Sequence, residues 1–168
     1  MQTFIPHQTF AGSARVLDDQ RLGKQRIEAS QILGVLVKRE WSQDEQRFVT
    51  MMPLGTVAWG SHPAVLMWQG AERGLLRYID AMCAEWRRRG HHDHIQERVL
   101  TIFNEVPAES KSVPDWLDGD EVCSSHRAVL LGKDYHHYSQ FGWLEKPAVK
   151  DSVTGRWPYV WPVSSTAT

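Results

Sequence analysis

Residues 13–37 read Ser-Ala-Arg-Val-Leu-Asp-Asp-Gln-Arg-Leu-Gly-Lys-Gln-Arg-Ile-Glu-Ala-Ser-Gln-Ile-Leu-Gly-Val-Leu-Val. At 3.6 residues per turn, this stretch predicts a helix with one apolar face that packs into the core. The apolar face consists of Leu22, Ala29, Ile32, Leu33 and Leu36. Either Ser13 or Asp18 can cap the helix, and basic residues indicate its end near Lys38 to Glu40.

A polar stripe runs beside the apolar face. Its members are Arg21, Lys24, Gln25, Glu28 and Gln31. Glu28 is the one carboxylate among these cations and amides, which suits a site that binds an anion and needs an acid or a base. The alternative is a solvated helix face stabilised by ion pairs four residues apart, such as Lys24 with Glu28. Helical spacing alone leaves both interpretations open.

The composition predicts one globular domain. The chain has 168 residues, of which 42% are hydrophobic and 23% charged, so it can bury a core of its own. We expect the domain to cover residues 1–163 and residues 164–168 to be a disordered tail. No apolar run approaches the roughly 20 residues that cross a bilayer, and the first residues lack a signal-peptide pattern. Cys83 and Cys123 are expected to be buried, reduced thiols, so a cytoplasmic location is predicted.

The net charge of −1 at pH 7 argues against nucleic-acid binding through a uniformly basic surface. The charge is uneven, however, because residues 115–121 are acidic while several cations crowd the first predicted helix. These cations are Arg15, Arg21, Lys24 and Arg26. Binding to DNA therefore requires a local basic patch.

The fold class is predicted to be mainly α: a single compact helical domain with an extended N-terminus and an irregular, aromatic and Pro-rich C-terminal tail. Prolines exclude a regular helix at 156–162. The other expected elements are an extended segment at 1–12, a loop or short hairpin at 41–61, a helix from Pro63 to Gly90, a helix at 93–104 capped by Asp93, and helical segments at 120–132 and 135–141.

Basic and aromatic residues also mark the second half of the chain. Ser125-His126-Arg127 is followed by Lys133, Tyr138 and Trp143, a face that can hold phosphates while rings stack on bases. The alternative is an aromatic stripe in the core. Of the eight tryptophans, Trp157 and Trp161 lie in the tail, which is either a clamp over the helices or a set of stacking surfaces.

Histidines suggest two further sites. His62 directly precedes a predicted helix, where it can cap the helix or contact an anion. The run His91-His92-Asp93-His94 contains residue types that bind zinc or nickel, but adjacent side chains do not point at one ion. We therefore expect no metal and no other cofactor.

Three motifs together resemble the pyrimidine-dimer DNA glycosylase, or endonuclease V, family. They are Leu17-Asp18-Asp19-Gln20-Arg21-Leu22 followed by Glu28, then Trp59-Gly60-Ser61-His62-Pro63, and then Tyr135-His136-His137-Tyr138-Ser139-Gln140-Phe141-Gly142-Trp143. The resemblance spans roughly residues 1–143 and is closer to the bacterial and phage branch than to the compact founding enzyme. It implies a small, mostly helical, metal-independent protein that acts on double-stranded DNA, and we expect a monomer.

The resemblance implies a DNA glycosylase with AP-lyase activity on a damaged or modified pyrimidine. The chain's own α-amine attacks C1′, an imine forms as the base leaves, and a helical Glu, here Glu28, promotes β-elimination. Gln2 hinders removal of Met1, so the implied nucleophile is Met1. The implied DNA-binding residues are Arg21, Lys24, Gln25, Arg26, His62, His126, Arg127, Lys133, Tyr138 and Trp143. The alternatives are a transferase that modifies a pyrimidine on the same scaffold and a noncatalytic DNA-binding module.

Overall fold

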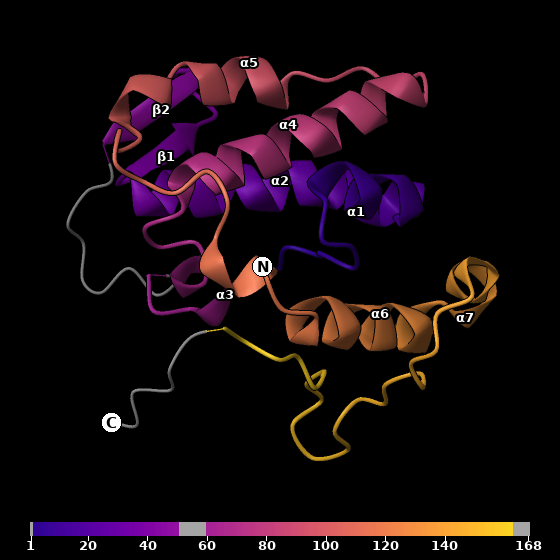
Figure 1. The fold of residues 1–168 in the computed structure, drawn as a ribbon. Coiled ribbons are helices and arrows are strands. Elements are labelled where there is room, and N and C mark those ends of the chain that lie inside the picture. The colour runs from indigo at the N-terminus through magenta and orange to yellow at the C-terminus, as the bar shows by residue number, and fades with distance from the viewer. Residues whose placement is uncertain (1, 51–59, 163–168) are drawn as a thin grey trace.

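The computed structural model describes residues 2–50 and 60–162. The described helices are α1 Phe10–Val16, α2 Asp19–Leu36, α3 Pro63–Leu66, α4 Glu72–Arg88, α5 Ile95–Leu100, α6 Glu121–Lys133 and α7 Tyr135–Tyr138. The described strands are β1 Arg39–Ser42 and β2 Arg47–Thr50, and short 3-10 turns lie at Phe103–Glu105, Asp115–Leu117 and Ser139–Phe141. Helices α1, α2, α4 and α5 lie together, while α6 and α7 lie on the other side of the N-terminal segment (Figure 1). The prediction of a mainly helical fold is confirmed.

Helix α2 begins where its capping residue predicts. Asp18 Oδ1 accepts a hydrogen bond from the backbone N of Arg21 at 2.9 Å. The other capping candidate, Ser13, lies inside α1, whose cap is Thr9, so the expected extended conformation is wrong for residues 10–12. Helix α2 ends at Leu36, slightly before the predicted end, because the chain turns into a two-stranded antiparallel hairpin.

The bounds of the hairpin and of helices α3 and α4 differ from those predicted for the segments 41–61 and 63–90. Strands β1 and β2 confirm the expected hairpin between 39 and 50, while residues 51–59 lie outside the described residues. The helix expected from Pro63 to Gly90 is two helices, α3 and α4. The chain breaks at Gly70, which has a φ of 78° that favours glycine, and it turns again at Gly90 with a φ of 90°.

The extended N-terminal segment is buried between three helices. Trp68 Nε1 donates to Thr3 Oγ1 at 3.0 Å, and the hydroxyl of Tyr78 in α4 donates to the Phe4 carbonyl at 3.0 Å. Residues 2–6 are buried, so this segment is a structural part of the core. The same burial brings the beginning of the chain against the polar stripe of α2.

The C-terminal tail packs along α6 without forming a helix at 156–162, as predicted. Ala148 N donates to the Ala128 carbonyl at 2.8 Å, and Val160 N donates to Ser125 Oγ at 3.1 Å. These contacts favour the clamp interpretation of the tail. Residues 164–168, expected to be disordered, lie outside the described residues.

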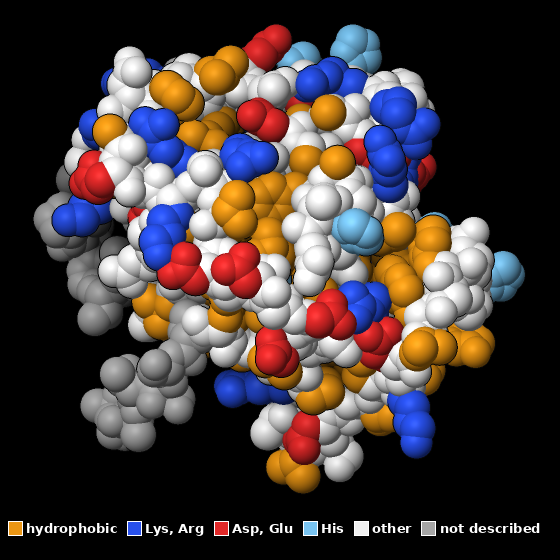
Figure 2. Space-filling model, viewed as in Figure 1, with side chains coloured by type: hydrophobic (Ala, Val, Ile, Leu, Met, Phe, Trp, Pro, Cys, Tyr) orange, Lys and Arg blue, Asp and Glu red, His pale blue; other side chains and the backbone are white. Residues whose placement is uncertain are grey.

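The remaining surface carries mixed charges. On the face shown in Figure 2, basic and acidic side chains are interspersed, and hydrophobic side chains gather around the position of α7. In the part of the chain that the structure describes, no helix is long and apolar enough to cross a membrane.

Candidate active site

A small cavity opens where the polar stripe of α2 meets the N-terminal segment. Its volume is about 280 Å³. Its lining residues are Gln2, Phe4, Gln20, Arg21, Lys24, Gln25, Glu28, Lys133 and Tyr159. They come from the N-terminal segment, α2, α6 and the tail, so four separate parts of the chain build the cavity.

Glu28 is the one carboxylate among the lining residues. Its Oε2 accepts a hydrogen bond from the backbone N of Gln2 at 2.7 Å, and its side chain is half-buried. Met1, the predicted nucleophile, lies outside the described residues. The structure therefore places Glu28 against the beginning of the chain, with a nitrogen of residue 2 in contact with the carboxylate.

Gln25 holds the N-terminal segment in place through buried hydrogen bonds. Its Oε1 accepts a hydrogen bond from Phe4 N at 2.7 Å and lies 2.7 Å from the Tyr78 hydroxyl, whose one proton is shared between Gln25 Oε1 and the Phe4 carbonyl. Gln25 and Tyr78 are buried, and burial raises the pKa of Tyr78, so the phenol keeps its proton and remains a donor. The structure thus assigns Gln25 a positioning role, although the side chain also lines the cavity.

His126 holds the same segment from the opposite side. Its Nδ1 accepts a hydrogen bond from Ile5 N at 2.9 Å, which places the proton of the neutral ring on Nε2. Burial lowers the pKa of His126 to about 3, and the residue is fully buried. It is therefore a neutral support for the segment, and no phosphate can reach it in this conformation.

The burial of His126 predicts a pH-dependent stability. The unfolded state binds a proton below pH of about 6.5, whereas the folded state binds it only near pH 3, so stability is lost as the pH falls through this interval. Between pH 7 and pH 5 the loss from this residue is about 2 kcal/mol. Urea unfolding at both pH values measures it. In the variant His126→Asn, the difference in the free energy of unfolding between pH 7 and pH 5 should shrink by about 2 kcal/mol. An unchanged difference would contradict the conclusion that His126 is buried and neutral.

Three of the predicted DNA-binding cations do meet at the cavity. Arg21, Lys24 and Lys133 all line it. The Arg21 guanidinium donates to Asp18 Oδ2 at 2.5 Å and lies 5.6 Å from the centre of the Tyr138 ring. Lys24 is exposed. Together these cations make the mouth of the cavity locally basic, which the net charge of the whole chain does not show.

Arg26 lies on another face of α2. Its guanidinium forms an ion pair with the buried carboxylate of Asp93 and lies 4.3 Å from the centre of the Trp86 ring. Arg26 itself is buried. Its charge is thus used within the fold, and the structure does not bring it to the cavity.

Four other predicted site residues make structural contacts away from the cavity lining. His62 caps α3, with its Nδ1 accepting from Ala64 N at 3.1 Å. Arg127 pairs with Asp120 and Glu145 and donates to the Pro6 carbonyl. Tyr138 is buried and donates to Asp18 Oδ2 at 2.5 Å, and Trp143 stacks on it with ring centres 5.7 Å apart. The aromatic stripe of this region is therefore largely core.

Tyr159 and Gln20 are cavity residues that the sequence reasoning missed. Tyr159 reaches the cavity from the tail, where its ring contacts Phe4 and His126 with centres 6.2 Å and 5.6 Å apart. Burial raises its pKa. The Pro-rich tail offered no local signal for this placement, because the contacts connect residues more than 30 positions apart.

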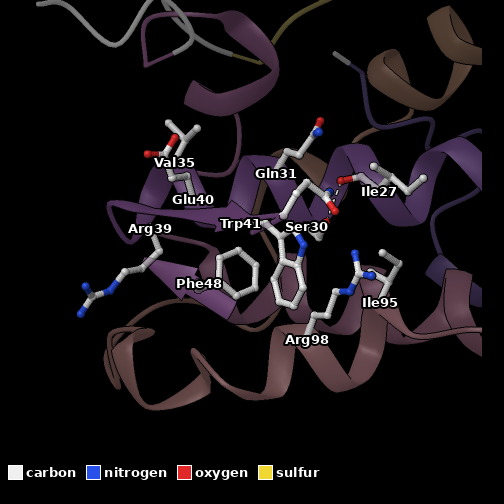
Figure 3. A pocket seen from close by; sticks show the side chains of 11 residues that line it. Ile27, Ser30, Gln31, Val35, Arg39, Glu40, Trp41, Phe48, Ile95 and Arg98 are labelled. Atoms are coloured by element: carbon white, nitrogen blue, oxygen red, sulfur yellow. Dashed lines mark hydrogen bonds between the residues drawn. The ribbon is translucent and has the colours of Figure 1, made fainter. Parts of the chain in front are cut away.

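A second, larger hollow lies between α2, the hairpin and α5 (Figure 3). Its volume is about 460 Å³, and Figure 3 shows Trp41 and Phe48 forming one wall. The Arg98 guanidinium lies 4.2 Å from the centre of the Trp41 ring. The carboxylate of this hollow, Glu40, is exposed and has no cationic partner among the described residues. The smaller cavity is therefore the better candidate for acid or base chemistry.

The histidine run at 91–94 is used for packing. His91 stacks on Trp86 with ring centres 3.8 Å apart, and Asp93 pairs with Arg26 and Arg87. Within residues 2–50 and 60–162, no three His, Cys, Asp or Glu side chains are arranged to hold a metal ion.

A comparison of the sequence with protein families identifies one family. A model of the family described as pyrimidine dimer DNA glycosylase matches residues 1–98. The chain belongs to this family of DNA glycosylases. The match includes Glu28 and the approach to α3, whereas the aromatic motif at 135–143, which also carried the resemblance, lies beyond it. No curated protein and no solved structure matches the chain.

Proposed function

We propose that this glycosylase removes a damaged or modified pyrimidine from double-stranded DNA and then cleaves the strand as an AP lyase. The contact between Glu28 Oε2 and the nitrogen of residue 2 supports the proposal. It lies in a cavity whose other charged lining groups are Arg21, Lys24 and Lys133. A carboxylate in contact with the backbone N–H of residue 2, next to the start of the chain and among cations that attract phosphates, is suited to imine chemistry on DNA by the N-terminal amine.

In the proposed reaction, the N-terminal amine attacks C1′ of the damaged nucleotide, the bond from C1′ to the base breaks, and the base takes the electron pair, so that an imine forms as the sugar ring opens. This amine belongs to Met1, or to Gln2 in a chain from which Met1 has been removed. With a pKa near 7.7 to 8.0, an α-amine is partly neutral and nucleophilic at neutral pH. Glu28 then takes the C2′ proton, and the 3′ phosphate leaves by β-elimination.

The residues around the cavity have separate roles in this reaction. Lys24 and Arg21 contact backbone phosphates at the mouth of the cavity, which positions the strand without reading its sequence. Gln25 and His126 accept hydrogen bonds from Phe4 N and Ile5 N, which holds the start of the described chain at the cavity. We further propose that the protein acts as a monomer in the cytoplasm, without a metal.

Incubation with duplex DNA that contains one cyclobutane pyrimidine dimer tests the function. We expect cleavage of the glycosidic bond of one pyrimidine of the dimer, whose base stays joined to its neighbour through the cyclobutane ring. We also expect strand cleavage, and a covalent protein–DNA adduct when borohydride is present. Undamaged duplex of the same sequence is the control. A mass gain on the base would instead indicate the transferase, and binding without any change in the DNA would indicate a noncatalytic module. Mass spectrometry of the mature protein identifies the N-terminal residue.

A further inference from the structure

Two lysine side chains line the cavity, the exposed Lys24 and the half-buried Lys133. Lys133 is the last residue of α6, and it lines the same cavity as Glu28 and Gln2. It is 105 positions away from Glu28 in the sequence, by the difference of their residue numbers. Only the packing of α6 against the N-terminal segment, visible in Figure 1, brings the two groups together.

Burial and neighbouring cations lower the pKa of Lys133 and so make its amine easier to deprotonate than that of an exposed lysine. Its Nζ lies 4.7 Å from the centre of the Trp157 ring, a contact that favours the ammonium form. Lys150 Nζ lies 5.6 Å from the same ring, so the positive charge of Lys150 is near and favours loss of the Lys133 proton. Burial lowers the pKa of Lys133, and the positive charges of Arg21 and Lys150 lower it further, while Glu28 opposes the shift. A lysine that is partly buried among other cations is a recognised form of activated nucleophile.

Gln2, the first described residue of the N-terminal segment, is more deeply buried than Lys133. Gln2 is buried, and its backbone nitrogen already donates to Glu28. Lys133 is half-buried at the cavity wall, and the structure shows no ion pair between it and another described residue within 4.0 Å. Glu28 lies close enough for its charge to act on Lys133.

We propose that Lys133 is a second imine-forming catalytic residue of this site, attacking the deoxyribose C1′ of the damaged or abasic nucleotide. The proposal rests on the function proposed above and adds a nucleophile to it. Neutral Nζ forms a bond to C1′, the bond from C1′ to the base breaks, and the base leaves with the electron pair and takes a proton from water. One amine proton moves to O4′ as the sugar ring opens, and the protonated imine keeps the other.

The later steps use Glu28. Its carboxylate takes the C2′ proton, the electrons of the C2′–H bond form a C2′–C3′ double bond, and the 3′ phosphate leaves with the electrons of the C3′–O bond. Water then hydrolyses the imine and frees Lys133. Lys133 and the N-terminal amine can therefore use the same general base.

Peptide mapping of the borohydride adduct tests the proposal in the unaltered protein. The full chain is incubated with dimer-containing duplex and with abasic duplex, reduced with borohydride and digested with trypsin. An adduct on the N-terminal amine is found on the peptide Met1–Arg15. An adduct on Lys133 blocks cleavage there and is found on the longer peptide Ala128–Lys150. We expect at least about a tenth of the adduct on Ala128–Lys150.

Two charge-conserving variants complete the test. Lys133→Arg keeps a cation over Trp157 but removes the nucleophilic amine, so the total borohydride adduct should fall by the share found on Ala128–Lys150 in the unaltered protein, while the adduct on Met1–Arg15 stays the same. Lys150→Arg, at the other ammonium over the same ring, should leave the total adduct unchanged. An adduct confined to Met1–Arg15 would overturn the role of Lys133 and leave the proposed function intact. Base release without any adduct would overturn both imine routes, and DNA that stays intact would overturn the proposed function itself.

Discussion

Glu28→Gln lowers the rates of base release and strand cleavage at least about 100-fold, because positioned general acid–base groups typically contribute 10²- to 10⁴-fold to a rate. The amide has nearly the same shape as the carboxylate and still accepts the hydrogen bond from Gln2 N. It cannot take up the C2′ proton. Single-turnover cleavage of dimer-containing duplex measures the loss, and a parallel binding assay should show affinity within about threefold of wild type.

The matched control for this variant is Glu97→Gln. Glu97 is an exposed carboxylate on α5, outside the cavity lining. Its variant should cleave at the wild-type rate. If Glu28→Gln keeps more than a tenth of the wild-type rate, Glu28 is not the general base of the proposed reaction.

Asp93→Ala lowers the free energy of unfolding by about 3 to 5 kcal/mol, because removal of one partner leaves a buried charge uncompensated. The Asp93 side chain is fully buried and pairs with Arg26 and Arg87. Burial opposes its ionisation, but hydrogen bonds from Cys83, Ile95 N and Arg26 outweigh burial and lower the pKa of Asp93. The carboxylate is thus charged in the folded state at neutral pH.

Urea unfolding at pH 7 measures this effect. The double variant Arg26→Met with Asp93→Ala should recover a large part of the lost stability, because it removes both charges. Asp80→Ala, at an exposed carboxylate that accepts from Gln96 Nε2, should cost less than about 1 kcal/mol and serves as the control. The stability that Asp93 contributes is present above its unfolded pKa near 3.9 and is lost as the pH falls through its lowered folded value. A double variant as unstable as the single one would contradict the ion-pair explanation.

Helix ends that depend on residues adjacent in the sequence could be predicted from the sequence alone. The cap of α2 at Asp18, the start of α3 at Pro63 and the chain reversal at Gly90 all follow from local backbone rules. The prediction was wrong where a local rule competed with packing. Helix α1 forms although residues 10–12 were expected to be extended, and Gly70 breaks a segment that was predicted as one helix.

The candidate site was only partly predictable. Glu28, Arg21 and Lys24 occupy one stripe of α2 at helical spacing, so their proximity follows from the period of the helix. Lys133 was predicted as a cation for DNA, and it does reach the same cavity. Arg26 and His126 were predicted beside these residues but are buried in other contacts, because a helical period does not say which neighbour covers each face.

The sequence by itself determined a mainly helical chain, its family and the polar stripe that contains Glu28, since these depend on residue types at short spacing. Only the tertiary structure decided what faces that stripe. The hydrogen bond from Ile5 N to His126 joins residues 121 positions apart, and the one from Gln2 N to Glu28 joins residues 26 apart. Such contacts form because burial of the N-terminal segment requires partners for its backbone groups. The packing that supplies these partners also places Lys133 and Tyr159 beside Glu28.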